Sequence, residues 1–339
     1  MSFLFPSSTI TIEAALRDLA GGSPKARAFA AHALGDVTDP TERARAVDAL
    51  ITALEDDRPE VRAEAASSLG DLREPSAIPL LVKRLDDGVA AVRQNAAIAL
   101  GTIGHADAFE PLAEALREGP ADLRFQAATS LAEIDPARAF DPLVAALGDR
   151  DPQVVGAAAL SLGAIGNKRA IAVLAPVIDH RDPGARFDAA YALAELGDAT
   201  GQGILVEAVG DAERAWDAVT ALATLGATAT SPSAARAVEA LGRALTDRRV
   251  PPEATVLAAG RLLEIAPASP HDDAARRVLL AALQARKTHV RGLAVEQLQR
   301  CGGEWAKAPL EKLARSGKGG ELLEAIASAL EAIAKREAR

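Results

Sequence analysis

The chain contains 339 residues and carries a formal net charge of −9, and 49% of its residues are hydrophobic while only 3% are aromatic. Alanine, which loses no side-chain entropy in a helix, supplies much of the hydrophobic fraction, and the alternating β-branched runs typical of sheets are missing, so we expect an all-α protein. The single cysteine excludes an intrachain disulfide, and no run approaches the roughly 18 apolar residues that span a bilayer. These observations favour a cytoplasmic protein.

Residues 1–23 are predicted to form an N-terminal segment and one capping helix. The opening letters MSFLFPSSTI lack the basic region of a signal peptide. The letters TIEAALRDLAGG that follow them predict a short helix. This helix would cover one open end of the structure that the next residues build.

Residues 24–318 repeat one helical pattern. A leucine recurs with spacings of 35, 31, 31, 31, 31, 29, 40 and 36 residues, at Leu34, Leu69, Leu100, Leu131, Leu162, Leu193, Leu222, Leu262 and Leu298. Another apolar residue follows each leucine three positions later. In the last repeat that residue is Cys301, which we therefore expect to act as a small buried hydrophobe. A period in this range predicts a solenoid of stacked helical hairpins.

Each repeat also contains a second helix, as in SAIPLLVKRLDD and DAFEPLAEALRE, whose apolar positions follow the i, i+3, i+4, i+7 rule. Asp-Pro pairs predict helix starts, because aspartate caps free amide groups and proline fits the first helical turn. They begin at Asp39, Asp135, Asp151 and Asp182. Glycines after the anchor leucine, such as Gly70, Gly101 and Gly163, would let neighbouring backbones approach.

The pattern PEVRAEAASSLG at residues 59–70, followed by a second helix that ends in LDD at residues 85–87, resembles HEAT repeats of the phycobilisome-lyase kind. The resemblance covers roughly residues 24–318 and is strongest from 56 to 197. It implies a right-handed α-solenoid of about nine helical hairpins with capping helices at both ends. It also implies that the first helices lie outside and that the second helices line the concave face.

The repeats over residues 24–211 are regular, whereas residues 212–318 have wider spacings and longer loops such as TDRRVPPEAT. The charge also changes: residues 1–235 carry 20 basic against 34 acidic residues, and residues 236–318 carry 15 against 9. Insertions in a solenoid often mark its binding face. An acidic partner surface or plain solvent would suit the basic residues here, which are Arg243, Arg248, Arg249, Arg276, Arg277, Arg286 and Lys287.

Residues 319–339 are predicted to form a C-terminal capping helix. The letters ELLEAIASALEAIAKREAR place an apolar stripe on one side of this helix, with Leu322, Leu323, Ile326, Leu330 and Ile333 as its members. The stripe would cover the last repeat, because the open end of a solenoid exposes an apolar face. A helix lying on a membrane surface is the alternative.

An arginine follows the valine anchor in six repeats, at Arg27, Arg62, Arg93, Arg124, Arg186 and Arg291. A column of cations would bind phosphates. A planar guanidinium also suits bidentate bonding to a carboxylate in an adjacent loop, and we favour this structural role, with Asp57 and Asp182 well placed as partners.

The few aromatic residues form a second column. Phe125, Phe187 and Trp216 each lie two residues after the valine anchor, roughly 140° from the centre of the buried stripe at about 100° per residue. Tyr191 lies one turn beyond Phe187. Two interpretations stay open: the rings are exposed and form a protein-binding hot spot, or they wedge between neighbouring first helices.

These patterns predict a non-enzymatic adaptor that binds another protein, through an acidic surface or an amphipathic helix of that partner. The five histidines lack metal-pair spacing, and neither a phosphate loop nor a nucleophile elbow is present, so no metal or other cofactor is predicted. The resemblance allows two alternatives, which are a phycobilin lyase that attaches bilin chromophores and a HEAT-like DNA glycosylase. The modest basic excess is not the usual nucleic-acid footprint.

Overall fold

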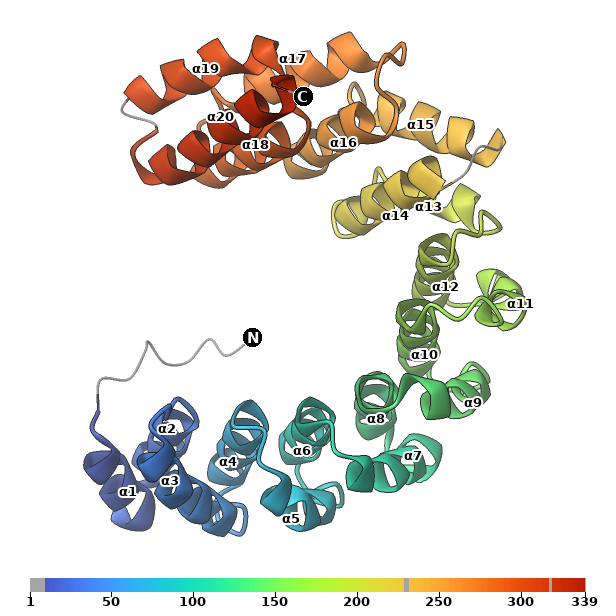
Figure 1. Ribbon diagram of the computed structural model, residues 1–339. Coiled ribbons are helices and arrows are strands. Elements are labelled where there is room, and N and C mark those ends of the chain that lie inside the picture. The colour runs from blue at the N-terminus through green and yellow to red at the C-terminus, as the bar shows by residue number, and fades with distance from the viewer. Residues whose placement is uncertain (1–9, 229–231, 317–318, 339) are drawn as a thin grey trace. The chain divides into compact units, whose positions relative to one another are not determined.

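The computed structural model describes residues 10–228, 232–316 and 319–338, and these residues contain helices and no strand. The chain divides into two compact units, Met1–Asn167 and Lys168–Arg339. Figure 1 shows the helices of each unit stacked side by side. The all-α fold predicted from composition and periodicity is confirmed.

The first unit contains ten α-helices in its described part: α1 (Ile12–Gly21), α2 (Pro24–Gly35), α3 (Pro40–Ala53), α4 (Pro59–Asp71), α5 (Ile78–Arg84), α6 (Ala90–Ile103), α7 (Phe109–Glu118), α8 (Ala121–Ile134), α9 (Pro136–Ala146) and α10 (Pro152–Ile165). Short 3-10 helices precede α5 and α7, namely η1 (Pro75–Ala77) and η2 (Ala106–Ala108).

The described part of the second unit contains another ten: α11 (Ala170–Leu174), α12 (Pro183–Glu195), α13 (Gln202–Ala208), α14 (Ala215–Thr228), α15 (Pro232–Ala244), α16 (Pro252–Ile265), α17 (Asp272–Ala282), α18 (Thr288–Cys301), α19 (Glu304–Arg315) and α20 (Leu323–Glu337). The 3-10 helices η3 (Ala175–Asp179) and η4 (Gly320–Leu322) follow α11 and precede α20.

Within each unit an even-numbered first helix pairs with the odd-numbered second helix that follows it, from α2 and α3 to α8 and α9 in the first unit and from α12 and α13 to α18 and α19 in the second. The nine anchor leucines identified in the sequence are all fully buried, at 0% exposure. Each therefore packs inside its repeat, as the solenoid prediction requires. The helix starts are confirmed as well, because the carboxylates of Asp39, Asp135, Asp151 and Asp182 accept hydrogen bonds from the first backbone N–H groups of α3, α9, α10 and α12.

The first helices approach one another closely. A Cβ atom placed on Gly70 of α4 would lie 2.9 Å from the Cα atom of Ala99 in α6, and one on Gly101 of α6 would lie 2.8 Å from the Cβ atom of Ser130 in α8. Within each unit, successive first helices consequently pack closely, whereas successive second helices touch little. Glycine after the anchor leucine thus reduces the distance between neighbouring first helices.

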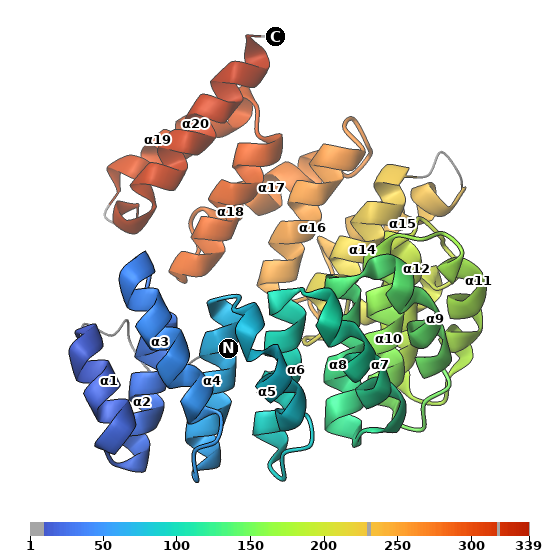
Figure 2. The same cartoon turned by 60° about the horizontal axis from the view of Figure 1, so that its bottom comes forward.

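The predicted order of inner and outer helices is wrong for the first unit. Figure 1 shows α4, α6 and α8 on the inner side of the curve of this unit, with α5, α7 and α9 outside. Figure 2 shows α4, α6 and α8 in succession from another direction. The reason is the glycine contacts, because the more closely spaced row must follow the shorter, inner arc.

Additional helices flank the hairpins. α1 packs on α2 and α3, and α20 packs on α18 and α19. Ile326, Ala329 and Ile333 of α20 are buried, while Leu323 at the start of this helix is 51% exposed. The apolar stripe of α20 therefore covers the last repeat, as predicted, and Leu323 does not belong to it.

The structure bears only in part on the predictions about the N-terminus, the domain limits and membrane spans. The interpretation of MSFLFPSSTI falls almost wholly on residues 1–9, which lie outside the described residues. The domain limits at 23, 211 and 318 stay predictions. Across the described part of the chain, no helix combines the length and apolar character that crossing a bilayer requires.

Candidate protein-binding surface

In the first unit, the arginine column connects its helices to carboxylates that lie further along the chain. Arg124 of α8 is bidentate, because its Nε and Nη2 atoms donate to the two carboxylate oxygens of Asp149, both at 2.7 Å, and its Nη1 donates to the carbonyl of Gly119. Arg62 of α4 binds Asp87 in the same way, with both distances 2.8 Å. These guanidinium groups are largely buried and already donate to carboxylate and carbonyl oxygens of the chain. The structural role favoured from the sequence is therefore observed in these repeats.

The other members of the column vary in their partners. Arg27 pairs with Asp56 and Asp57, and Arg93 pairs with Asp122. Asp57 is thus a partner as predicted, whereas Asp182 caps α12 and its carboxylate does not pair with Arg186. Arg186 and Arg291 donate mainly to loop carbonyl groups.

Exposed apolar side chains gather on the first helices. Six large hydrophobic residues are exposed in the described part of the chain, and four of them lie on α6, α8, α10 and α14. They are Ile98, Phe125, Leu160 and Trp216, with exposures of 43%, 40%, 39% and 43%. We call them, together with the half-buried Tyr191 of α12, the first-helix face, of which Ile98, Phe125 and Leu160 form the part in the first unit and Tyr191 and Trp216 the part in the second.

These residues share one side of their helices. Ile98, Leu160 and Tyr191 lie two residues before the anchor leucine, and Phe125 and Trp216 lie six residues before it. Positions four residues apart are neighbours on a helix, and both positions lie about 200° to 240° around the helix from the anchor. Because the anchor leucine is buried, the first-helix face points away from the core of the repeat.

Phe187 does not belong to this exposed surface. Its ring is only 5% exposed, and the guanidinium carbon of Arg214 lies 5.1 Å from the ring centroid. Of the two interpretations of the aromatic column, exposure therefore holds for Phe125 and Trp216, and packing holds for Phe187. The spacing from Leu193 to Leu222 is the shortest in the chain, and the loop that carries Arg214 lies at that junction.

The surface around Tyr191 and Trp216 is acidic. Asp188 of α12 and Asp217 of α14 occupy the same repeat position, five residues before the anchor leucine. Burial, opposed by Arg214 and assisted by Asp182 and Asp217, raises the pKa of Asp188 to about 6. Burial together with Glu195 and Asp217 also raises the pKa of Tyr191. The side chains of α12 and α14 thus lie within electrostatic reach of one another.

The predicted basic residues form no single patch with the aromatic residues. Arg243 lies on α15, and Arg248 and Arg249 lie in the loop before α16. Arg276 and Arg277 lie on α17, and Arg286 and Lys287 lie in the loop before α18. Acidic neighbours already pair with Arg249, Arg276 and Lys287, which contact Asp247, Asp272 and Glu253. In the parts of the chain that the structure describes, Arg248, Arg277 and Arg286 have no ion pair.

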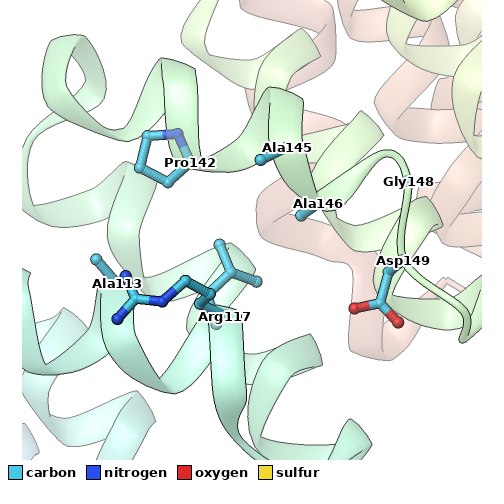
Figure 3. Close-up of a pocket in the computed structure, with 8 residues that line it drawn as sticks. Ala113, Arg117, Pro142, Ala145, Ala146, Gly148 and Asp149 are labelled. Carbon is cyan, nitrogen blue, oxygen red and sulfur yellow. The ribbon is translucent and has the colours of Figure 1, made fainter.

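Shallow grooves open between the second helices. One groove of about 350 Å³ lies between α7 and α9, and others of about 310 and 350 Å³ lie between α5 and α7 and between α13 and α15. Figure 3 shows Pro142 and Ala145 of α9 above Arg117 of α7, with Asp149 at one end. Asp149 already binds Arg124. The groove is therefore a result of the wider spacing of second helices and offers no free nucleophile and base.

Cys301 is inert by its surroundings. Its Sγ donates to the carbonyl of Gln297 at 3.1 Å, and burial raises the pKa of the thiol to about 11. A thiol with such a pKa holds almost no thiolate at neutral pH. This agrees with the predicted role of a small packed side chain.

The comparisons with known proteins decide the family. A profile of HEAT repeats matches residues 12–101, 47–132, 86–161, 109–194 and 140–226, which overlap and together cover more than half of the chain. The chain belongs to the HEAT-repeat family. No curated protein matches it.

Solved structures resemble this HEAT-repeat chain. Importin β is 13% identical, with a TM-score of 0.55, and the match covers 95% of this chain and 52% of that chain. An engineered protein is 22% identical, with a TM-score of 0.42 and coverage of 95% and 98%. The complex of CpcE and CpcF of phycocyanin lyase from Nostoc sp. PCC7120 is 26% identical, with a TM-score of 0.40 and coverage of 81% and 96%. The likeness to importin β shows a shared solenoid fold.

Sequence reasoning missed two members of the first-helix face of this HEAT-repeat protein. Ile98 and Leu160 are aliphatic residues in alanine-rich helices, where they look like core residues. The available signal was their repeat position, since each lies two residues before an anchor leucine, as Tyr191 does. Under the exposed interpretation of the aromatic column, Tyr191 would have marked that position as outward-facing.

Proposed function

We propose that this HEAT-repeat protein is a scaffold that binds another protein through its first-helix face. The observation that supports the proposal is the concentration of exposed apolar residues there, with four of the six in the described chain on first helices. Exposed aromatic and aliphatic side chains contribute binding energy when a partner covers them. Isolated exposed apolar residues are common, but a repeated position on consecutive helices is a pattern.

The first unit offers an uncharged part of this face. Ile98, Phe125 and Leu160 lie on the consecutive first helices α6, α8 and α10, and Gln94 and Thr129 share the same side. An amphipathic helix of a partner would cover such a surface with its apolar side. The basic residues Arg248, Arg277 and Arg286 remain a proposed second contact for an acidic surface.

The test is quantitative affinity purification from the native cells. The tagged wild-type chain is compared with a Phe125→Ala/Trp216→Ala variant and with a control variant, Val89→Ala/Leu323→Ala, which truncates two exposed apolar residues outside the first-helix face. We expect the first variant to lose a specific partner at least tenfold, while the control retains it. Circular dichroism checks that all three chains are folded.

Two outcomes would overturn the proposal. Equal capture by the Phe125→Ala/Trp216→Ala variant and the wild type would remove the first-helix face from binding. Equal loss in both variants would show that capture depends on general surface hydrophobicity.

A further inference from the structure

The part of the first-helix face on α12 and α14 differs from the rest because carboxylates share the outward side of these helices with the aromatic rings. Asp188, Tyr191 and Glu195 follow one side of α12 at positions i, i+3 and i+7, and Trp216 and Asp217 lie at the start of α14. The hydroxyl of Thr224 on α14 donates to Glu195 on α12 at 3.4 Å, so the two helices are in register there. We call these five residues the acidic aromatic face.

The carboxylates of this face are not neutralised within the chain. Asp188, Glu195 and Asp217 make no ion pair with any described residue, whereas the loop carboxylates of the arginine column do. The one nearby cation is Arg214, which lies over the ring of Phe187 and donates to the carbonyl of Pro183 at 3.2 Å. The acidic aromatic face therefore places negative charge on the same side of α12 and α14 as a half-exposed indole.

Burial of a carboxylate is unfavourable, and at Asp188 the effect of burial outweighs the opposing attraction of Arg214. The Asp188 side chain is largely covered, and that burial disfavours the charged form. Asparagine has nearly the same shape and would avoid this cost. A carboxylate at this position has a physical use if a cation approaches it in a complex, because ion pairs that exclude water are stronger than exposed ones.

We infer that the acidic aromatic face binds a segment of a partner protein that carries arginine or lysine next to an apolar side chain. The inference rests on the proposed scaffold function and specifies the chemistry of the partner where it covers α12 and α14. The cation would lie over the indole of Trp216, whose π-face attracts cations, and between Asp188 and Asp217. The aliphatic stem of the cation and its apolar neighbour would cover the ring of Tyr191.

The test uses random 12-residue peptides displayed on phage and selected on the full-length chain at physiological salt. We expect the enriched peptides to have a net positive charge and to share an arginine or lysine beside an aliphatic or aromatic residue. A synthetic, fluorescently labelled copy of the most enriched peptide then reports affinity by anisotropy. Trp216→Ala is expected to weaken binding about tenfold or more.

A pair of variants with equal net charge separates local recognition from general attraction to an acidic protein. Asp188→Asn/Asp217→Asn removes two carboxylates from the acidic aromatic face. Glu207→Gln/Asp273→Asn removes two exposed carboxylates on the second helices α13 and α17. We expect the first variant to bind the peptide about tenfold more weakly and the second to bind within twofold of the wild type.

Four outcomes would overturn the inference. Enrichment of neutral or acidic peptides whose binding still depends on Trp216 would contradict the inference of a basic segment but would remain consistent with the scaffold function. Equal weakening by the two double variants would show that only net charge matters. The absence of enriched peptides would argue against peptide recognition by this face. Self-association that Trp216→Ala abolishes, measured by sedimentation velocity, would assign the face to a second copy of the chain.

Discussion

Arg124 and Asp149 form one of the most buried ion pairs of the molecule, with 5% and 12% of their side chains exposed. The bidentate contact satisfies Nε and Nη2 of the guanidinium, and a backbone carbonyl takes Nη1. The hydrogen bond to Asp149 raises the pKa of Arg124. Burial alone would raise the pKa of Asp149, but the bonds from Arg124 and from the backbone lower it. Removal of one partner of such a pair destabilises the fold, because the other charge then stays buried without a partner.

Arg124→Ala should therefore destabilise the protein by about 2 to 4 kcal/mol, since Asp149 would stay buried without a cation. Urea denaturation followed by circular dichroism measures the effect. Lys83→Ala serves as the control, because Lys83 pairs with Glu55 while both side chains are more than half exposed, and the loss should stay below about 1 kcal/mol. Equal losses in the two variants would contradict the role of the arginine column.

Asp188→Asn should raise stability at neutral pH. Between pH 3.8 and about 6 the folded chain holds a proton on Asp188 that the unfolded chain releases, so stability falls as the pH rises through this window. The substitution should raise the melting temperature by a few degrees at pH 7.5, about 1 kcal/mol after allowing for solvent screening, and should have little effect at pH 4. A gain that is the same at both pH values would show that the charge of Asp188 is not its cause.

The same residue column contains both exposed and buried aromatic rings, and this distinction was beyond sequence reasoning. Phe125, Phe187 and Trp216 occupy equivalent positions on the helical wheel, which predicts equal orientation. Burial of Phe187 depends on Arg214, which comes from the following repeat. Periodicity describes one helix at a time, and the residue that covers a side chain belongs to another.

At the scale of the element, the first helices were predictable and the second helices were less so. The anchor leucine located the first helices, and the Asp-Pro pairs located the starts of two first helices, α10 and α12, and two second helices, α3 and α9, because both signals reflect local requirements for burial and capping. The segment SAIPLLVKRLDD, by contrast, was expected to be one continuous helix, but it begins as η1 and continues as α5. Pro79 lacks a backbone donor and fits only the first turn of α5. Tertiary packing decides where such short helices begin.

The contact between α4 and α6 gives a prediction for Gly70→Ala. The added Cβ would lie 2.9 Å from the Cα atom of Ala99, so the helices must separate, and the cost should exceed the gain in helix propensity by about 1 to 2 kcal/mol. Thermal unfolding of the variant checks this. Gly88→Ala is the matched control, because no atom lies within 4 Å of its added Cβ. A Gly70→Ala chain as stable as wild type would mean that the first helices tolerate wider spacing.

At the scale of the whole molecule, the chain divides into two compact units, and the boundary in the sequence lies between residues 167 and 168. In a repeat protein each hairpin contacts mainly its neighbours, so stability is distributed along the chain. The first unit keeps nine consecutive helices with their buried leucines and arginine pairs, together with α1.

Residues 1–167 produced alone should therefore fold. We expect a helical circular dichroism spectrum and a cooperative thermal transition, at a lower temperature than that of the full chain because the new end is uncapped. A spectrum of an unfolded chain would show that the first unit depends on the second.

The arginine pairs of the first unit also bear on how such a chain changes length. The carboxylate that binds each arginine lies 25 to 30 residues downstream, which is less than one 31-residue period. Duplication of a segment that runs from one arginine to the residue before the next, such as 62–92 or 93–123, would copy that arginine together with its own aspartate, so the new repeat would bring its ion pair with it. Genes for chains of this kind can therefore gain or lose whole repeats without leaving a buried charge unmatched.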